Sequence, residues 1–194
     1  MTERFITIRE YVKQVLCEGG SHGFDHTLRV TRLCQIIGME ERADMNILIP
    51  AALFHDIARP VEKKIGIPHE EEGAKIAGEY LRLNHYPEVN IPHIMHAIQT
   101  HRFRSDLAPK TLEAKILSDA DKLDAIGAVG IARTFISAGE RNGDITDAMN
   151  HIDEKLVKLK DMMYTKTGQE IARMRHEYLL SFVRTIREEM DNED

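Results

Sequence analysis

The sequence predicts an all-α protein whose helices form one bundle. Apolar residues recur at helical spacing along nearly the whole chain, and no stretch of useful length shows the alternation that is typical of a strand. The 194 residues, 42% of them hydrophobic, are enough for a domain with a real core. Neither a linker nor an internal repeat marks off a second domain.

Apolar spacing predicts the first three helices. Residues 6–16 and 28–37 each place their apolar side chains along one face. A third helix is expected over 42–58, where Pro50 either kinks the helix or restarts it, because proline lacks the amide hydrogen that a helix interior needs. The Arg-Pro pair at 59–60 ends this helix.

The middle of the chain is predicted to continue as shorter helices. Residues 61–68 contain a glycine and a proline and are expected to form a loop. Helices then follow over 70–83, 92–101, 109–125 and 130–138.

Two long polar helices are predicted to close the chain after a surface loop at 139–144. They span roughly 146–164 and 169–190, and their amphipathic pattern indicates that they pack onto the preceding residues. We therefore expect a single domain over 1–194, with a helical core at 1–138 and the C-terminal helices at 139–194 packed on it. These helices either bury a homodimer face or complete the core of a monomer.

Composition limits the classes of function. The net charge of −6 argues against broad nucleic-acid binding, although a small anionic substrate stays compatible with it. The two cysteines, Cys17 and Cys34, do not make a disulfide framework, which fits a reducing cytoplasm. No apolar run is long enough for a membrane span, and the first residues lack the apolar region of a signal peptide. We expect a cytoplasmic protein with neither a membrane nor a nucleic acid as partner.

The most informative feature is the pair His55-Asp56 at the end of an apolar run over 51–58. Burying an imidazole and a carboxylate is costly unless something pairs with them, and a divalent transition metal suits nitrogen and oxygen donors. His26 on the first turn of one predicted helix and Asp121 within another supply two further ligands, because a bundle brings ligands from different helices together. Four such ligands leave open the coordination positions that catalysis requires.

The chain resembles the HD-domain metal-dependent phosphohydrolase superfamily, in particular its small bacterial and archaeal hydrolases. The matching runs are residues 22–30, 51–58 and 116–127, and the resemblance extends into the C-terminal helices. It implies an HD-domain bundle whose residues 1–138 bind metal through His26, His55, Asp56 and Asp121. Asp121 is chosen because it precedes Lys-Leu, as the family's ligand precedes a basic residue and leucine; Asp119 and Asp124 are the alternatives.

The resemblance leaves one ion or two open. Some branches of the superfamily have two extra histidine ligands, and His69 and His101 resemble them in context, in which case Asp56 would bridge two ions. Alternatively, His69 caps a helix at the rim of the cleft and His101 contacts substrate. The chain departs from some nucleotide-hydrolysing relatives, because Arg59 and Pro60 stand where those proteins have two acidic residues.

The resemblance implies hydrolysis of a nucleotide or another small phosphorylated metabolite by a metal-activated water. His55, Asp56 and Asp121 would be catalytic. Manganese or iron is favoured, and nickel, cobalt or zinc suits the same ligands. Candidate substrate-binding residues are Arg29, Arg59, His96 and Lys122; for Arg29 and Lys122 a solvated surface side chain is the alternative, and for His96 plain packing.

Two rival functions stay open. The first is a di-iron oxygenase, since a few relatives use two irons and dioxygen, and this function requires His69 and His101 as ligands. The second is a sensor domain that binds metal and nucleotide without turnover. Counting metal ions per chain tests the first rival, and ligand binding without product formation would favour the second.

Overall fold

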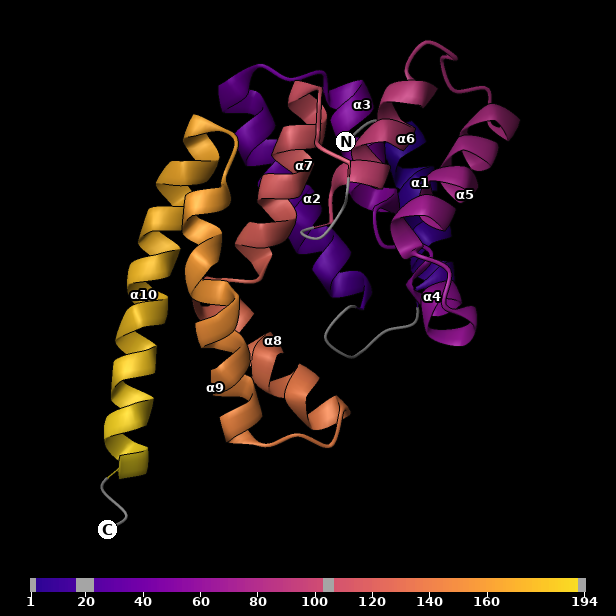
Figure 1. Ribbon diagram of the computed structural model, residues 1–194. Helices are drawn as coiled ribbons and strands as arrows, with labels where there is room; N and C mark the ends of the chain where they lie inside the picture. The colour runs from indigo at the N-terminus through magenta and orange to yellow at the C-terminus, as the bar shows by residue number, and fades with distance from the viewer. Residues whose placement is uncertain (1–2, 17–22, 103–106, 192–194) are drawn as a thin grey trace.

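The computed structural model describes residues 3–16, 23–102 and 107–191, and within these ranges all regular structure is helical, which confirms the all-α prediction (Figure 1). His22, the first residue of the first family motif, lies outside the described residues. The described helices are α1 (Glu3–Val15), α2 (Phe24–Glu41), α3 (Met45–Phe54), α4 (Arg59–Ile65), α5 (His69–Leu83), α6 (Ile91–Thr100), α7 (Leu112–Asp124), α8 (Gly127–Glu140), α9 (Ile145–Glu154), the 3₁₀ helix η1 (Leu156–Met162) and α10 (Lys166–Asp191).

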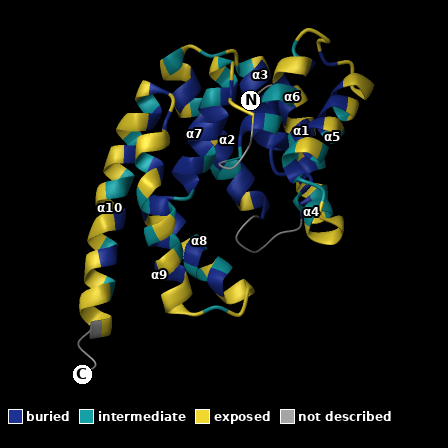
Figure 2. Cartoon of the chain, in the orientation of Figure 1, coloured by how far each residue is buried: buried dark blue, intermediate teal, exposed yellow. Residues whose placement is uncertain are grey.

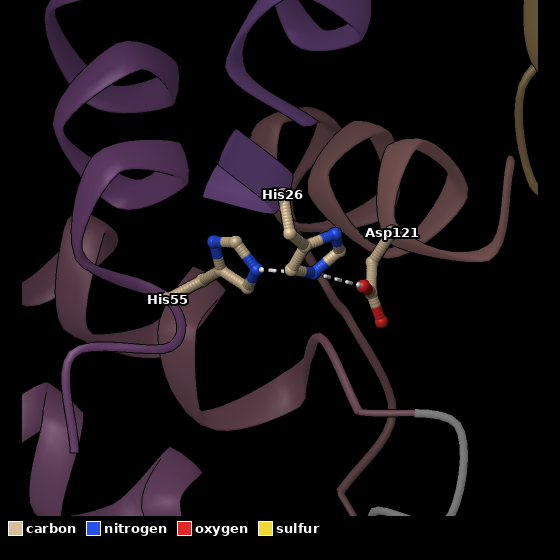
Figure 3. Close-up of side chains that lie close together, drawn as sticks. All are labelled: His26, His55 and Asp121. Carbon is tan, nitrogen blue, oxygen red and sulfur yellow. Dashed lines mark hydrogen bonds and ion pairs between the residues drawn. The ribbon is translucent and has the colours of Figure 1, made fainter. Parts of the chain in front are cut away.

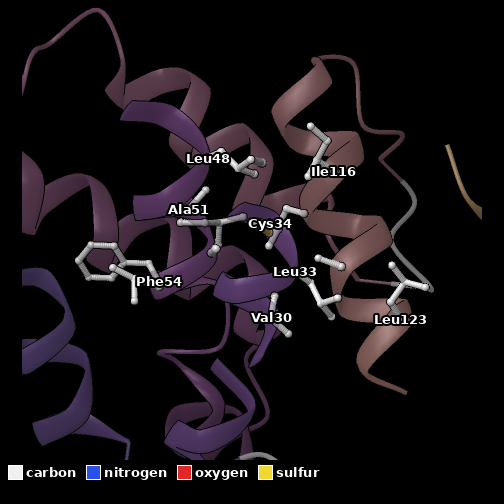
Figure 4. Close-up of a cluster of buried hydrophobic side chains, with 14 of the residues drawn as sticks. Val30, Leu33, Cys34, Leu48, Ala51, Phe54, Ile116 and Leu123 are labelled. Carbon is white, nitrogen blue, oxygen red and sulfur yellow. The ribbon is translucent and has the colours of Figure 1, made fainter. Parts of the chain in front are cut away.

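Helix α3 is the centre of the core. Every residue from Ile47 to Phe54 is buried, because α1, α2, α6 and α7 all pack against this helix. A helix that is covered on all sides has no polar face, which explains its continuous apolar sequence. Figure 4 shows side chains of α2, α3 and α7, among them Val30, Leu48 and Ile116, meeting in one cluster.

The third predicted helix is shorter than expected at both ends. The carboxylate of Asp44 accepts a hydrogen bond of 2.8 Å from the Asn46 amide and begins α3, which runs through Pro50 as one helix. Helix α3 ends at Phe54, so that residues 55–58 form turns instead of helix. This early end releases His55 and Asp56 from the regular spacing of the helix and lets both side chains face the interior.

The prediction of a loop over 61–68 is wrong for its first half, because Arg59–Ile65 form α4. Pro60 lies in the first turn, where its missing amide hydrogen has no cost, and Glu62 there suits the positive end of the helix. Lys63 and Lys64 lie in the last turn, and Gly66 ends the helix with φ of 76°. The glycine that suggested a loop is the residue that terminates a helix.

The first of the two long C-terminal helices is divided in the structure. The chain forms α9, a 3₁₀ helix η1 and then α10, with the break at Lys155. Leu156 and Leu159 are both buried, and 3₁₀ geometry places residues three apart on one face. The 3₁₀ turn therefore buries both leucines while the chain turns towards α10.

Helix α10 packs on α8, α7 and α2, and Figure 2 shows an exposed outer stripe along it. Its start is held by Asp119 of α7, which accepts hydrogen bonds from the Tyr164 amide and from the amide and hydroxyl of Thr165, all at 2.7–2.8 Å. The Thr165 hydroxyl in turn accepts from the Gly168 amide as a helix cap. Within the described ranges, every helix is too short or too polar to cross a bilayer.

Candidate metal centre

Three segments far apart in sequence bring His26, His55 and Asp121 together (Figure 3). The His26 Nε2 atom lies 3.3 Å from His55 Nε2 and 3.3 Å from Asp121 Oδ1. Asp56 faces the same point, with its Oδ2 atom 3.5 Å from His26 Nε2 and 3.7 Å from His55 Nε2. His26, His55 and Asp56 are buried, whereas the Asp121 side chain is 24% exposed and forms the open side.

A second pair of histidines faces the other oxygen of Asp56. His69 is the first residue of α5 and His101 follows the last residue of α6, and their Nε2 atoms lie 3.4 Å apart. Asp56 Oδ1 lies 3.3 Å from His69 Nε2 and 3.8 Å from His101 Nε2. The carboxylate of Asp56 therefore lies between two pairs of imidazoles, one pair for each oxygen.

All four imidazoles use Nδ1 as a donor, which fixes the role of Nε2. His55 Nδ1 donates to the Ala52 carbonyl at 2.7 Å and His101 Nδ1 to the Ile98 carbonyl at 2.6 Å. His26 Nδ1 lies 2.7 Å from Asp124 Oδ2, and His69 Nδ1 lies 2.9 Å from Glu62 Oε2. A carbonyl or a carboxylate only accepts, so in each neutral ring the Nε2 atom presents a lone pair to the centre.

Burial and hydrogen bonding shift the pKa values of these groups in different directions. Burial lowers the pKa of His55 to about 4, so that its ring is neutral at pH 7. For His26 burial acts in the same direction, but hydrogen bonds with Asp121 and Asp124 outweigh it and raise the pKa. The bond with Asp121 belongs to the protonated ring, whose Nε2 carries a hydrogen; a metal ion would take the place of that hydrogen. Burial opposes ionisation of Asp121, yet the hydrogen bond with His26 holds its pKa well below the usual range.

This donor set fits a divalent transition metal ion. Lone pairs on imidazole nitrogens and carboxylate oxygens converge within 4.8 Å in the sets His26, His55, Asp121 and His55, Asp56, His101. Backbone carbonyls and carboxylates hold the far side of each ring, which is the usual support of histidine ligands in metal sites. Without a cation, the Nε2 lone pairs of the neutral His69 and His101 rings would face one another across 3.4 Å at little benefit.

The other two aspartates of the run 119–124 have different tasks. Asp119 caps the segment before α10, as described above. Asp124 accepts from His26 Nδ1, from Arg29 Nε at 2.9 Å and from Arg133 Nη1 at 2.6 Å. The geometry therefore favours Asp121 over both alternatives, because its oxygen faces His26 Nε2, the ring nitrogen that points to the centre.

A cavity of about 490 Å³ opens beside Asp121. Its lining comes from α4, α7, α8, α9 and η1, from residues next to them and from Arg102 after α6. It consists of Arg59, Arg102, Asp121, Lys122, Ala125, Arg133, Ser137, Arg141, His151, Lys155 and Leu159. Arg59 and Lys122, two of the predicted substrate-binding residues, belong to this lining. The Lys122 ammonium group lies 2.6 Å from Ser118 Oγ and 4.8 Å from the centre of the Tyr164 ring.

The other two predicted substrate-binding residues are held elsewhere. Arg29 pairs with Asp25 at 2.5 Å and with Asp124, so it supports the residue that orients His26. His96 Nε2 accepts a hydrogen bond of 3.0 Å from the Lys110 amide and secures the segment before α7. Helical spacing from His26 suggested a phosphate contact for Arg29, but spacing does not reveal which nearby carboxylates compete for an arginine.

Sequence reasoning missed the residues behind the second histidine pair. Glu62 holds His69 Nδ1, and Arg102 bridges Glu62 and Glu70 at 3.1 and 3.2 Å. Glu62 lies on α4, which the sequence presented as a loop, and Glu70 belongs to a run of acids that suited a solvated helix start. The helix signals around Pro60 and Gly66 could have indicated that Arg59 and Glu62 share one face.

The fold and the donor set together define an all-α protein with a site for a divalent metal. The HD-domain family model matches residues 23–126. This range contains the six residues that face the centre, which are His26, His55, Asp56, His69, His101 and Asp121. The chain belongs to the HD-domain family of metal-dependent hydrolases, as its motifs suggested.

Similar proteins cover nearly the whole chain. YpgQ of Bacillus subtilis is 37% identical to it over 96% of this chain and 94% of its own length. The crystal structure of YpgQ in complex with ADP matches with a TM-score of 0.78 and 33% identity, over 95% of this chain and 97% of that one. An HD-superfamily hydrolase of Bacillus thuringiensis matches with a TM-score of 0.77 and 32% identity, over 97% of both chains.

Proposed function

We propose that this protein is a metal-dependent phosphohydrolase that acts on a nucleotide or another small phosphorylated metabolite. The observation that carries this proposal is the basic cavity beside the metal centre. Six arginine and lysine residues line it, whereas Asp121 is the one acidic residue among its described lining residues. This concentration of positive charge in a chain of net charge −6 favours a strongly anionic ligand. The ADP bound to YpgQ supports a nucleotide.

We assign the first ion to His26, His55, Asp56 and Asp121, and a second ion to His69 and His101, with Asp56 shared. When bound, a divalent ion would polarise a phosphoryl oxygen and activate the attacking water. Manganese and iron suit these nitrogen and oxygen donors best. His26 and His55 contribute neutral nitrogens that Asp124 and the Ala52 carbonyl orient.

The cavity residues bind and orient the phosphate groups. Arg59 and Lys122 lie closest in sequence to the ligands Asp56 and Asp121, and both reach the cavity. Arginine forms paired hydrogen bonds to phosphate oxygens, and the buried lysine adds a localised positive charge. Together they offset charge that develops on the phosphoryl group. Arg29 and His96 act through the positions of Asp124 and of the segment before α7.

The proposal is tested by phosphate and pyrophosphate release from a panel of nucleotides with added Mn²⁺. The native chain should release product, and Asp56→Ala and Asp121→Ala should each abolish the release. Asp161→Ala is the matched control, because Asp161 is exposed, pairs with Lys160, and belongs neither to the proposed ligands nor to the lining of the cavity. Product formation that survives in Asp56→Ala or Asp121→Ala would overturn the assignment.

One observation also favours a second candidate, a di-iron oxygenase. His69 and His101, which that function requires, lie opposite Asp56 Oδ1. Dioxygen consumption by the iron-loaded protein, with no phosphate release under any metal, would select this function. A sensor would bind ADP with neither product. The six basic residues of the cavity have no task in dioxygen chemistry, and we therefore place phosphate hydrolysis first.

A further inference from the structure

We propose that Arg59 competes with the second metal ion for Asp56 and thereby sets how many ions the centre holds. This inference rests on the metal ligands proposed above. It follows from the position of the Arg59 guanidinium group, which contacts the Asp56 carboxylate on the side of His69 and His101.

Arg59 contacts only one of the two oxygens that the histidine pairs face. Its Nε atom donates to Asp56 Oδ1 at 2.9 Å. This is the oxygen that lies 3.3 Å from His69 Nε2 and 3.8 Å from His101 Nε2. The Oδ2 atom faces His26 and His55 instead. A cation is therefore already present on the half of the centre where the second ion would bind.

The guanidinium group also holds the support of one proposed ligand. Arg59 Nη1 donates to Glu62 Oε2 at 3.1 Å, and the same oxygen accepts from His69 Nδ1. An arginine stays charged under all ordinary conditions, so an ion at this half meets both a blocked oxygen and a like charge. For the second ion to bind, Arg59 must give up its hydrogen bond with Asp56.

The first half of the centre has its arginines on the other side of the ligands. Arg29 and Arg133 donate to Asp124, which lies behind His26 at Nδ1. On this half Asp56 Oδ2 faces the Nε2 atoms of His26 and His55, whereas on the other half Arg59 donates directly to Asp56 Oδ1. This asymmetry predicts a first ion that binds tightly and a second that binds weakly.

Arg59 has room to leave. Its side chain is 21% exposed and lines the cavity, whereas its backbone is held at the first position of α4 beside Pro60. A turn of the side chain into the cavity would free Asp56 Oδ1 without any change in the helix. The blocking contact is thus a reversible one, and substituting Arg59 is the direct way to remove it.

The test is a Mn²⁺ titration by calorimetry, with bound ions counted by elemental analysis, on the native chain, Arg59→Met and Arg141→Met. Methionine keeps the length of the arginine side chain without its charge. Arg141 lines the same cavity from the end of α8, so Arg141→Met removes the same charge there. We expect the second ion to bind about tenfold more tightly in Arg59→Met, the effect of one charge-assisted hydrogen bond.

Arg141→Met should change the affinity for the second ion by less than about threefold, as expected of a screened charge. If Arg59→Met binds the second ion with unchanged or lower affinity and the first ion with native affinity, this inference is overturned and the proposed metal centre stays intact. Equal gains in both variants would also overturn it, because they would show a general effect of charge. No ion bound by the native chain would overturn the metal centre and this inference together.

Discussion

At the scale of single residues, each histidine of the centre is defined by the acceptor behind it. Two of these acceptors are backbone carbonyls, which a substitution does not change, and two are the carboxylates of Asp124 and Glu62. The side-chain acceptors are therefore the places where ligand orientation can be tested without touching a ligand.

Asp124→Asn should lower the affinity for the first Mn²⁺ ion by about 10–100-fold, the usual effect of losing a carboxylate behind a histidine ligand. Asparagine keeps the shape of the side chain but no longer attracts the His26 Nδ1 hydrogen as a charge. Calorimetric titration measures the effect. Asp25→Asn removes the charge from another partner of Arg29 but keeps an acceptor for the His26 amide, so it should leave the affinity unchanged. Equal affinities in the native chain and Asp124→Asn would contradict the role of Asp124.

The metal-free protein should lose stability as the pH falls from 6.5 towards 4. The pKa of His55 is about 4 in the folded chain and about 6.5 when unfolded, so its contribution is complete above pH 6.5 and is lost below it. The raised pKa of His26 acts oppositely and stabilises the protein below pH 6.5. Urea unfolding with a chelator should show that His55→Gln loses about 3 kcal/mol less than the native chain between pH 7 and pH 4. Identical pH dependence in both would contradict this.

The sequence offered His26, His55 and Asp56 as ligand candidates because their residue types and order are distinctive within a helical chain, whereas Asp121 was chosen among three aspartates through the family resemblance. The supporting residues could not be predicted. Nothing in the sequence distinguishes Asp124 and Glu62 from other acidic residues. Their role depends on the ring that each one faces, which is His26, 98 residues away, for Asp124 and His69, 7 residues away, for Glu62. Such contacts are set by packing rather than by local pattern.

At the scale of elements, α4 is the helix that was not predicted from the sequence, and it carries both Arg59 and Glu62. Gly66 ends it in a left-handed conformation with φ of 76°, and a Cβ added there would meet no atom within 4 Å. The glycine is thus needed for its backbone and not for space.

Gly66→Ala should therefore lower the free energy of unfolding by about 1 kcal/mol, the usual cost of a left-handed alanine. Gly139→Ala is a matched control, because Gly139 is also exposed and unobstructed but lies within α8. The control should raise stability by about 0.5–1 kcal/mol, since alanine favours a helix. Chemical unfolding measures both changes. A Gly66→Ala variant with the same free energy of unfolding as the native chain would contradict the role of the left-handed conformation.

The remaining differences between prediction and structure also arise at this scale. Apolar spacing identified most helices, because one buried face repeats through each of them. It failed at residues 155–162, where Leu156 and Leu159 suit an α-helix and a 3₁₀ helix equally well. Only the packing of η1 against α10, α9 and α7 distinguishes the two.

At the scale of the whole molecule, metal binding and folding should be linked. The proposed ligands come from α2, α7 and the segments that follow α3 and α6, together with the start of α5, so the unfolded chain does not present them together. Mn²⁺ at about 100 times its dissociation constant should add about 2.7 kcal/mol of stability. For a domain of this size, the melting temperature should rise by about 5–10 °C. Asp56→Ala removes the ligand that both proposed ions share, so this variant should melt at the same temperature with and without Mn²⁺. A native chain whose melting temperature Mn²⁺ does not change would contradict the linkage.

Cys34 lies in the core that these helices share (Figure 4), fully buried between α2 and its neighbours. Burial, followed by the charges of Asp121 and Asp119, raises the pKa of its thiol far above the usual value. A thiol that is both covered and protonated does not react with alkylating reagents until the bundle opens. With Cys17→Ser in place, the alkylation rate of Cys34 measures how often the bundle opens. A lower rate with Mn²⁺ would show that the metal centre is occupied, without the use of any substrate.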